Sequence, residues 1–233
     1  MKQKRLTPFG HVPVLREETA CGQTLELAEI TLIEQFLAQR STLSPSSLLG
    51  NNFWEENQIK MFTCSSHALM SFLIHNITSL PSKEDRPALL EMFKKSKLPG
   101  WIVFHEKHLR ANGSNGHYVG DQVKFPPPHL HFLVNYFFTV KKTNRLASFS
   151  SLLILKNVST QKKKKLSLAD IKTGTIIEHL IRLCGDAPQI SEELTPGIWA
   201  VKKHLETIPA YAEWTASAQY QEFTGTNIGF FGF

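Results

Sequence analysis

Two long stretches with helical periodicity restrict this chain, more than any other feature, to a fold built on a bundle of helices. Within 53–77 and within 85–111, apolar and aromatic residues recur at spacings of three, four and seven. Such spacing places them on one face of an α-helix. They are Trp54, Met61, Phe62, Ala68, Leu69, Phe72 and Leu73, and then Leu89, Leu90, Phe93, Trp101, Ile102, His105 and Leu109. Because such long faces must be covered, we interpret these residues as core.

More helices are predicted in the last third of the chain. Ser167 and Asp170 form an N-terminal capping pattern. The serine side chain can accept a hydrogen bond from the Asp170 amide, and the Asp170 carboxylate can accept one from the Ser167 amide. The helix that follows is predicted to end just before Gly185. Residues 196–206 and 210–217 fit two further helices.

The first 40 residues have a different pattern. Residues 7–15 (TPFGHVPVL) combine a turn with a short strand, and residues 17–25 fit a strand, a turn and a second strand. Residues 25–40 are predicted to form a helix, and residues 41–52 are a linker by composition. The apolar face expected for that helix consists of Leu25, Ala28, Leu32, Ile33, Phe36 and Leu37. The pattern therefore predicts a short α/β front followed by an all-helical bundle.

Residues 122–165 carry the excess positive charge of the chain. The 233 residues have a formal net charge of +6, which favours a nucleic-acid or anionic-membrane partner. Nine of the 26 Lys and Arg residues lie in this segment with no Asp or Glu, which leaves 17 basic against 20 acidic residues elsewhere. The rest of the protein is mildly acidic, so we expect no nucleic-acid partner. The apolar run at 129–140 is far shorter than the roughly 20 residues of a membrane span, so we expect no membrane partner.

The same segment differs in composition from both of its neighbours, with a Pro-Pro-Pro run, aromatic clusters and a terminal Lys-Lys-Lys-Lys. Our hypothesis is that residues 123–161 are a retained intron translated in frame. The codons for Gln122-Val123 can contain a splice donor sequence, and the codons for Thr160-Gln161 can end in a splice acceptor sequence. A disordered basic arm and an amphipathic element on a membrane surface remain as alternatives.

The potential metal ligands of the chain do not form a recognisable site. The three cysteines, at positions 21, 64 and 184, have no ligand-like spacing. Their odd number and the absence of a Cys-x-x-Cys motif indicate a reduced, intracellular setting, and the N-terminus has no apolar signal core, so we expect a cytoplasmic protein. His129 and His131 have no acidic residue or cysteine nearby in sequence, so we expect no metal.

The order of these motifs resembles that of the glutathione transferase family, particularly its sigma-like and fungal members. TPFGHVPVL (7–15) resembles the strand with the family's cis-proline, and LELAEITLIEQFLA (25–38) resembles the start of its glutathione-binding helix. KHLRANGSNGHYVGD (107–121) and LSLADIKT (166–173) resemble the end of one bundle helix and the capped start of the next. The C-terminal FFGF is similar to that of fungal members.

The resemblance implies a fold that is mostly α overall. Residues 1–40 would be an α+β, truncated thioredoxin-like front that binds glutathione, and 41–52 a linker. Residues 53–233 would be the family's all-α C-terminal domain, interrupted by the insert at 122–165. Complete family members begin with a further βαβ unit, which supplies the catalytic Tyr or Ser. On this resemblance the chain is N-terminally truncated, and its catalytic residue is unknown.

The resemblance also implies which residues contact glutathione at the strand. Pro13 would be the cis-proline, and Val12 would offer its backbone N–H and C=O to the cysteinyl backbone of glutathione. A cis X–Pro bond costs only about 0.5–1 kcal/mol more than a trans bond. Lys4 and His11 would contact the glycine carboxylate. Each of these four residues also fits an ordinary surface or edge-strand role.

The γ-glutamyl end of glutathione would lie at the start of the helix. Glu29 would bind its ammonium group, and the helix amides, including that of Ile30, would bind its carboxylate. The family usually has Ser at the position of Ile30, so this chain lacks one hydroxyl donor. Loss of a charge-assisted hydrogen bond costs about 1.5–3 kcal/mol of binding free energy. Glu29 as a solvated helix residue is the alternative.

Three functions are compatible with this reading. The family conjugates the glutathione thiolate to electrophiles in detoxification. Its members use glutathione as co-substrate, need no cofactor and are commonly homodimers. Because the region of the catalytic Tyr or Ser is missing, we expect little or no turnover. The alternatives are a non-catalytic interaction or scaffold domain, and an inactive product of a misread gene.

Overall fold

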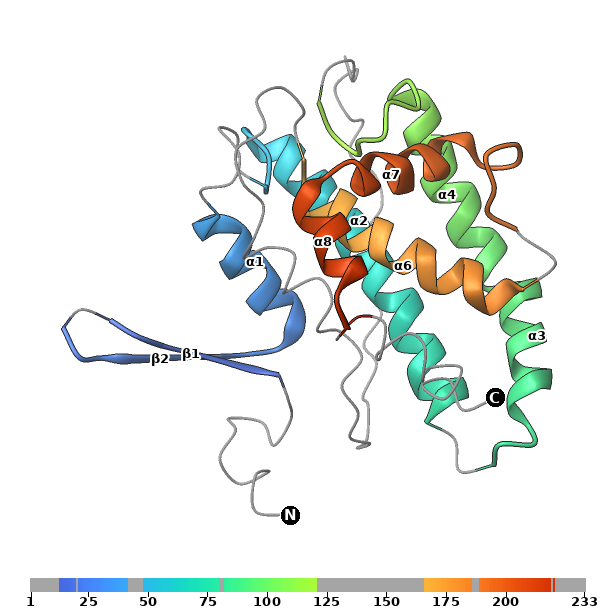
Figure 1. Cartoon of the computed structure of the whole chain (residues 1–233), viewed down its shortest axis with the longest axis horizontal. Coiled ribbons are helices and arrows are strands. Elements are labelled where there is room, and N and C mark those ends of the chain that lie inside the picture. The colour runs from blue at the N-terminus through green and yellow to red at the C-terminus, as the bar shows by residue number, and fades with distance from the viewer. Residues whose placement is uncertain are drawn as a thin grey trace, which may run out of the picture.

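In the computed structural model, residues 13–19, 21–41, 48–79, 82–120, 166–185, 189–218 and 220 are described. Figure 1 shows a β-hairpin and a first helix set beside a group of packed helices. The front consists of β1 (Val14–Glu18), β2 (Thr24–Ala28) and α1 (Ile30–Arg40). The helices that follow are α2 (Phe53–Leu73), with a π-helical turn at Ile74–Thr78, α3 (Arg86–Ser96), α4 (Leu98–Ala111), α6 (Leu168–Cys184), α7 (Pro196–Glu206) and α8 (Pro209–Ala216). The predicted fold class, a small α+β front on a helical bundle, is confirmed.

The hairpin forms around a tight turn at its far end. The Thr19 amide donates to the Gln23 carbonyl at 2.8 Å, and the Gly22 amide donates to the Thr19 carbonyl at 2.9 Å. Gly22 has a φ of 79°, a backbone conformation that glycine adopts without steric cost. The strands are antiparallel, with Val14 opposite Ala28 and Glu18 opposite Thr24. In Figure 1 the turn points away from the helices, and α1 lies between the hairpin and the bundle.

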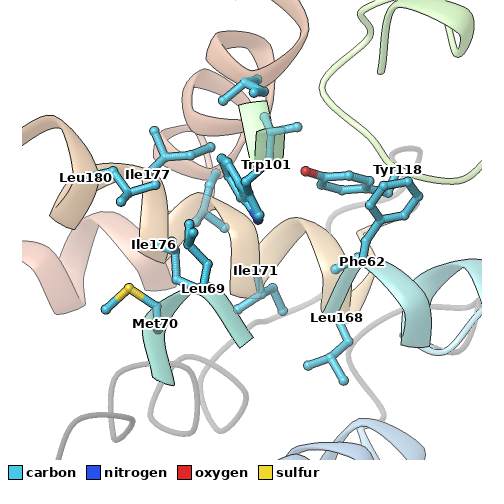
Figure 2. Close-up of a cluster of buried hydrophobic side chains, with 14 of the residues drawn as sticks. Phe62, Leu69, Met70, Trp101, Tyr118, Leu168, Ile171, Ile176, Ile177 and Leu180 are labelled. Atoms are coloured by element: carbon cyan, nitrogen blue, oxygen red, sulfur yellow. The ribbon is translucent and has the colours of Figure 1, made fainter. Parts of the chain in front are cut away.

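Helix α6 lies at the centre of the bundle, packed against both α2 and α7. Ser167 and Asp170 cap its start: the Ser167 side chain accepts from the Asp170 amide at 3.3 Å, and the Asp170 carboxylate accepts from the Ser167 amide at 2.7 Å. The buried side chains of α6 meet those of α2 and α4 in the main core (Figure 2). Phe62 and Tyr118 pack side by side there, with ring centroids 4.6 Å apart.

The prediction of a helix over 25–40 is wrong at its start. Thr24–Ala28 is strand β2, and α1 begins only at Ile30. The reason is tertiary: this segment pairs along its whole length with β1, which overrides its helical propensity. The expected apolar face is partly confirmed, because Ala28 and Ile33 are buried and Leu37 packs against the core. It is wrong at Leu25 and Leu32, which are exposed, and it omits Glu34 and Ala38, which are buried.

The stretch at 85–111 forms two helices rather than one. α3 ends at Ser96 and α4 begins at Leu98, with Lys97 between them. Pro99 accounts for the break, because proline has no N–H to continue the hydrogen bonding of α3 and is tolerated in the first turn of a helix. Most of the residues expected in the core of the two periodic stretches are buried, among them Phe62, Leu69, Leu73, Leu90, Phe93, Trp101 and Leu109. The expectation is wrong for Trp54 and Met61 on α2, which are exposed.

Candidate functional site

The open end of the hairpin brings together the predicted site residues that the structure describes. Val14 pairs with Ala28, so Pro13 and Glu29, the next residue on each side, flank this pair at the same end of the hairpin. Ile30 follows Glu29 as the first residue of α1. Glu29 is exposed, whereas Pro13 and Ile30 are half-buried. The other three predicted contacts, Lys4, His11 and Val12, lie outside the described residues, as does the insert at 122–165.

Glu29 has an unusual backbone conformation, with φ 73° and ψ 119°. A non-glycine residue rarely adopts positive φ, and such strain, of order 1–3 kcal/mol, is found preferentially at functional sites. The conformation turns the chain from β2 into α1, and the Glu29 carbonyl accepts the first helical hydrogen bond, from the Ile33 amide at 3.0 Å. Glu29 is therefore the N-cap of α1. The sequence pattern places it inside a helix over 25–40, and that prediction is wrong.

The N-terminus of α1 has chemistry that suits an anionic ligand. No side-chain hydrogen bond from the described residues caps its first turn, and that turn contains no acidic residue. The free amides and the helix dipole give such an end a partial positive charge. The exposed Glu29 carboxylate adds a negative charge beside it, so the site offers partners for both an anion and a cation.

Helix α1 is fixed to the bundle by a buried ion pair that the sequence analysis missed. The Lys172 ammonium on α6 lies 2.5 Å from the Glu34 carboxylate on α1, and both side chains are buried. Glu34 lies four residues after Ile30 and four before Ala38, so it shares a helix face with apolar residues. A charged residue on that face was the signal available in the sequence, since buried carboxylates are rare unless they are paired.

An open hollow of about 360 Å³ lies near the other end of α1. Its lining consists of Gln39, Leu49, Gly50, Asn51, Asn52, Phe53 and Glu56. Gln39 is ten residues beyond Glu29, which corresponds to about 15 Å along an α-helix. The hollow is therefore separate from the residues gathered at the end of the hairpin.

None of the described tyrosines is available to activate a bound thiol at the hairpin end. Burial raises the pKa of Tyr118 well above its usual value, and its hydroxyl lies 2.6 Å from Nδ1 of His105. Burial also raises the pKa of Tyr211. The Tyr220 hydroxyl donates to the Glu178 carboxylate, and burial raises the pKa of Tyr220 too. All three are held within or against the helical bundle.

The described residues contain neither a helix that could span a membrane nor a cluster that could hold a metal ion. No helix there is both long enough and apolar enough to cross a membrane. In the same part of the chain, no group of three or more His, Cys, Asp or Glu side chains could hold a metal ion.

Comparison with known proteins finds similarity in three-dimensional structure but not in sequence. No family model and no curated protein matches the sequence. Among solved structures, the chain is similar to "Fasciola hepatica sigma class GST", a glutathione transferase, with a TM-score of 0.59 and 16% sequence identity. The match covers 91% of this chain and 76% of that one. The chain therefore has a fold like that of a sigma class glutathione transferase.

Proposed function

We propose that this protein is a glutathione-transferase-like protein that binds glutathione at the open end of its hairpin, with little or no conjugating activity. One observation carries the proposal: Pro13 and Glu29 flank the Val14–Ala28 pair at the point where α1 begins. Two chain segments that resemble separate parts of a glutathione site thus meet at one place. The strained backbone of Glu29 adds support, as does the start of α1, which has no side-chain cap among the described residues.

In the proposed complex, each end of glutathione has a partner of matching chemistry. The γ-glutamyl carboxylate accepts hydrogen bonds from the amides at the start of α1, including that of Ile30, and the γ-glutamyl ammonium pairs with Glu29. Val12, next to Pro13, pairs through its backbone with the cysteinyl unit, as the family resemblance implies. Lys4 and His11 bind the glycine carboxylate on the same grounds.

Low turnover follows from the chemistry of the thiol. A thiol of ordinary pKa is mostly protonated near neutral pH, and its activation requires a hydrogen-bond donor or a positive charge nearby. The described tyrosines are engaged in the bundle, and the side chain of Ile30 cannot donate a hydrogen bond. The electrophilic co-substrate, the role in detoxification and the cytoplasmic location belong to the same proposal, as does the division into a front at 1–40 and a bundle at 53–233.

The experiment uses the purified full chain with glutathione and a chloronitrobenzene acceptor. Titration calorimetry is expected to detect glutathione binding, while the conjugation rate stays close to that of a protein-free blank. Turnover well above the blank would contradict the low-activity part of the proposal. Absence of glutathione binding by folded protein would contradict the proposal as a whole and leave a non-catalytic interaction domain or the inactive product of a misread gene.

A second candidate is a non-catalytic interaction domain that pairs with a second copy of itself. Exposed apolar side chains on α2 and α4 favour it: Phe53 and Trp54 are 70% and 60% exposed, and Met61, Val103 and Phe104 are exposed too. Trp54 and Met61 are seven residues apart and share a face of α2. Sedimentation of the full chain is expected to give a dimer that a Trp54→Glu substitution converts to monomer, whereas monomeric wild-type protein would exclude this candidate.

A further inference from the structure

We propose that Glu34 and Lys172 are positioning residues, which set the place of the ligand site by fixing α1 against α6. This inference rests on the proposed function, because the site that they place is the glutathione site at Glu29. The two residues are 138 positions apart in sequence, and Nζ of Lys172 lies 2.5 Å from Oε1 of Glu34. The side chain of Lys172 is 5% exposed and that of Glu34 is 0% exposed.

The pair supplies a directional contact that apolar packing does not. Ile33 and Ala38 bury the same side of α1, and such contacts hold a helix without dictating how far it slides or turns. A buried ion pair is different, because separation of its charges in a low-dielectric interior is strongly unfavourable. The pair therefore selects one register of α1 on α6.

Lys172 is a fixed reference point within the bundle. Its neighbour Thr173 lies within hydrogen-bond distance of Ser66 on α2, with the two hydroxyl oxygens 3.1 Å apart and both residues fully buried. His67 on α2 lies close enough to Lys172 that burial, and then the Lys172 charge, lower the pKa of His67 to about 4. His67 is thus uncharged near neutral pH, and Glu34 provides the charge that balances Lys172.

The position set at Glu34 is transmitted to the site through one turn of helix. Ile30 lies four residues before Glu34, about 6 Å along the helix axis, and Glu29 is the N-cap. α1 is a regular helix from Ile30 to Arg40, so a shift at Glu34 moves its first amides by a similar amount. Ligand hydrogen bonds weaken steeply with such shifts.

Three variants separate positioning from simple stabilisation. Glu34→Gln leaves the Lys172 charge buried without its carboxylate partner, so it lowers stability as well as binding. The double variant Glu34→Leu with Lys172→Met removes both charges, and such replacements are often neutral or stabilising. Lys172→Arg retains the charge and tests conservative rescue. Glu17→Gln is the matched control, because Glu17 pairs with Arg40 at the opposite, exposed end of α1.

Glutathione affinity is measured by calorimetry, and hydrogen exchange of the α1 amides by mass spectrometry, at a temperature where every variant is folded. The double variant is expected to keep wild-type stability, exchange its α1 amides faster and bind glutathione roughly 10- to 100-fold more weakly. Lys172→Arg and Glu17→Gln are expected to bind much as the wild type does. Wild-type affinity in the double variant, or unchanged exchange of its α1 amides, would overturn the inference.

These measurements distinguish failure of the proposed function from failure of the positioning role. If folded wild-type protein does not bind glutathione, the proposed function fails and the positioning of a glutathione site fails with it. If the wild type binds and the double variant binds equally well, only the positioning role fails. Weaker binding that merely follows loss of stability, with no defect in a stable double variant, also contradicts positioning.

Discussion

The buried carboxylate of Asp170 joins two parts of the chain that are far apart in sequence. Its Oδ1 accepts a hydrogen bond from the Tyr118 amide at 2.8 Å, across 52 residues. Its Oδ2 accepts from the amide and the hydroxyl of Ser167, at 2.7 and 2.8 Å. One side chain thus caps α6 and also holds the segment that follows α4 against the start of α6.

Asp170→Ala is expected to lower the free energy of unfolding by about 2–4 kcal/mol, because it removes the cap and leaves the buried Tyr118 amide without its acceptor. Urea unfolding followed by circular dichroism measures the loss. Asp85→Ala is the matched control, since Asp85 is an exposed N-cap whose side chain makes no capping hydrogen bond. Equal losses in the two variants would contradict the role assigned to Asp170.

Deletion of residues 123–161 is expected to leave a folded protein. Tyr118 and Ser167 both bind Asp170, so the two flanks of the segment lie close together. The residues left between Gly120 and Leu166, each spanning about 3.3 Å, can bridge that gap. Loop-closure entropy gives a gain in stability of about 1–2 kcal/mol for such a shortening.

The deletion variant is compared with the full chain by far-ultraviolet circular dichroism and urea unfolding. Loss of the cooperative transition would show that the segment is needed for folding and would contradict the retained-intron hypothesis. Amplified transcripts from the source provide an independent check. The hypothesis fails if the segment is present in all of them at full abundance.

Glu106→Gln is expected to lower the free energy of unfolding by about 1–3 kcal/mol. The buried Glu106 carboxylate on α4 accepts from the amides of Gly197 and Ile198, at 3.0 and 2.9 Å, and from Arg110 at 2.7 Å. It therefore caps α7 from a neighbouring helix, and a neutral amide cannot satisfy all three donors. Glu91→Gln, which alters an exposed carboxylate that pairs with the half-buried Lys94, is the control and should change the unfolding midpoint little.

Acid is expected to destabilise the fold through His105. Burial, and then the charge of His108, lower the pKa of His105 to about 3. The unfolded chain, with a histidine pKa near 6.5, binds more protons than the folded chain between about pH 6.5 and 3, so this contribution to stability falls as pH falls through that window. The slope is at most about 1.4 kcal/mol per pH unit for this group.

Urea unfolding at several pH values between 7 and 4 measures this slope. His105→Gln is expected to reduce the slope of stability against pH by up to about 1.4 kcal/mol per pH unit, the value for one proton. His75→Gln, at an exposed position, is the control. Burial also lowers the pKa of His67 and of His179 to about 4, so the wild-type slope includes their contributions in the same direction. An unchanged slope in His105→Gln would contradict the assignment to His105.

Glu29→Ala is expected to weaken glutathione binding by roughly tenfold or more, because it removes the carboxylate proposed for the ligand ammonium. Glu18→Ala is the matched control, since Glu18 is an exposed carboxylate at the opposite end of the same hairpin. Calorimetric titration of both variants measures the difference. Equal affinities would exclude Glu29 from the binding site.

Local sequence patterns were sufficient to predict where a helix begins when a short stretch of residues supplies its own capping hydrogen bonds. The start of α6 follows from the capping pair Ser167 and Asp170, which lie three positions apart. The extent of α7 matches the prediction from its own residues, but its cap, Glu106 on α4, comes from a distant part of the chain. Local pattern failed at residues 25–28, because whether LELA becomes strand or helix depends on its pairing with β1.

The sequence alone determined that this chain builds a bundle of amphipathic helices behind a short α/β front, because apolar periodicity dictates which faces must be buried. Only the tertiary structure decided that Pro13 and Glu29 flank one strand pair and that Glu34 meets Lys172 on α6. Such contacts join residues far apart in the chain, and their existence depends on how helices and strands pack together. A periodic pattern specifies which face is buried but not which partner covers it.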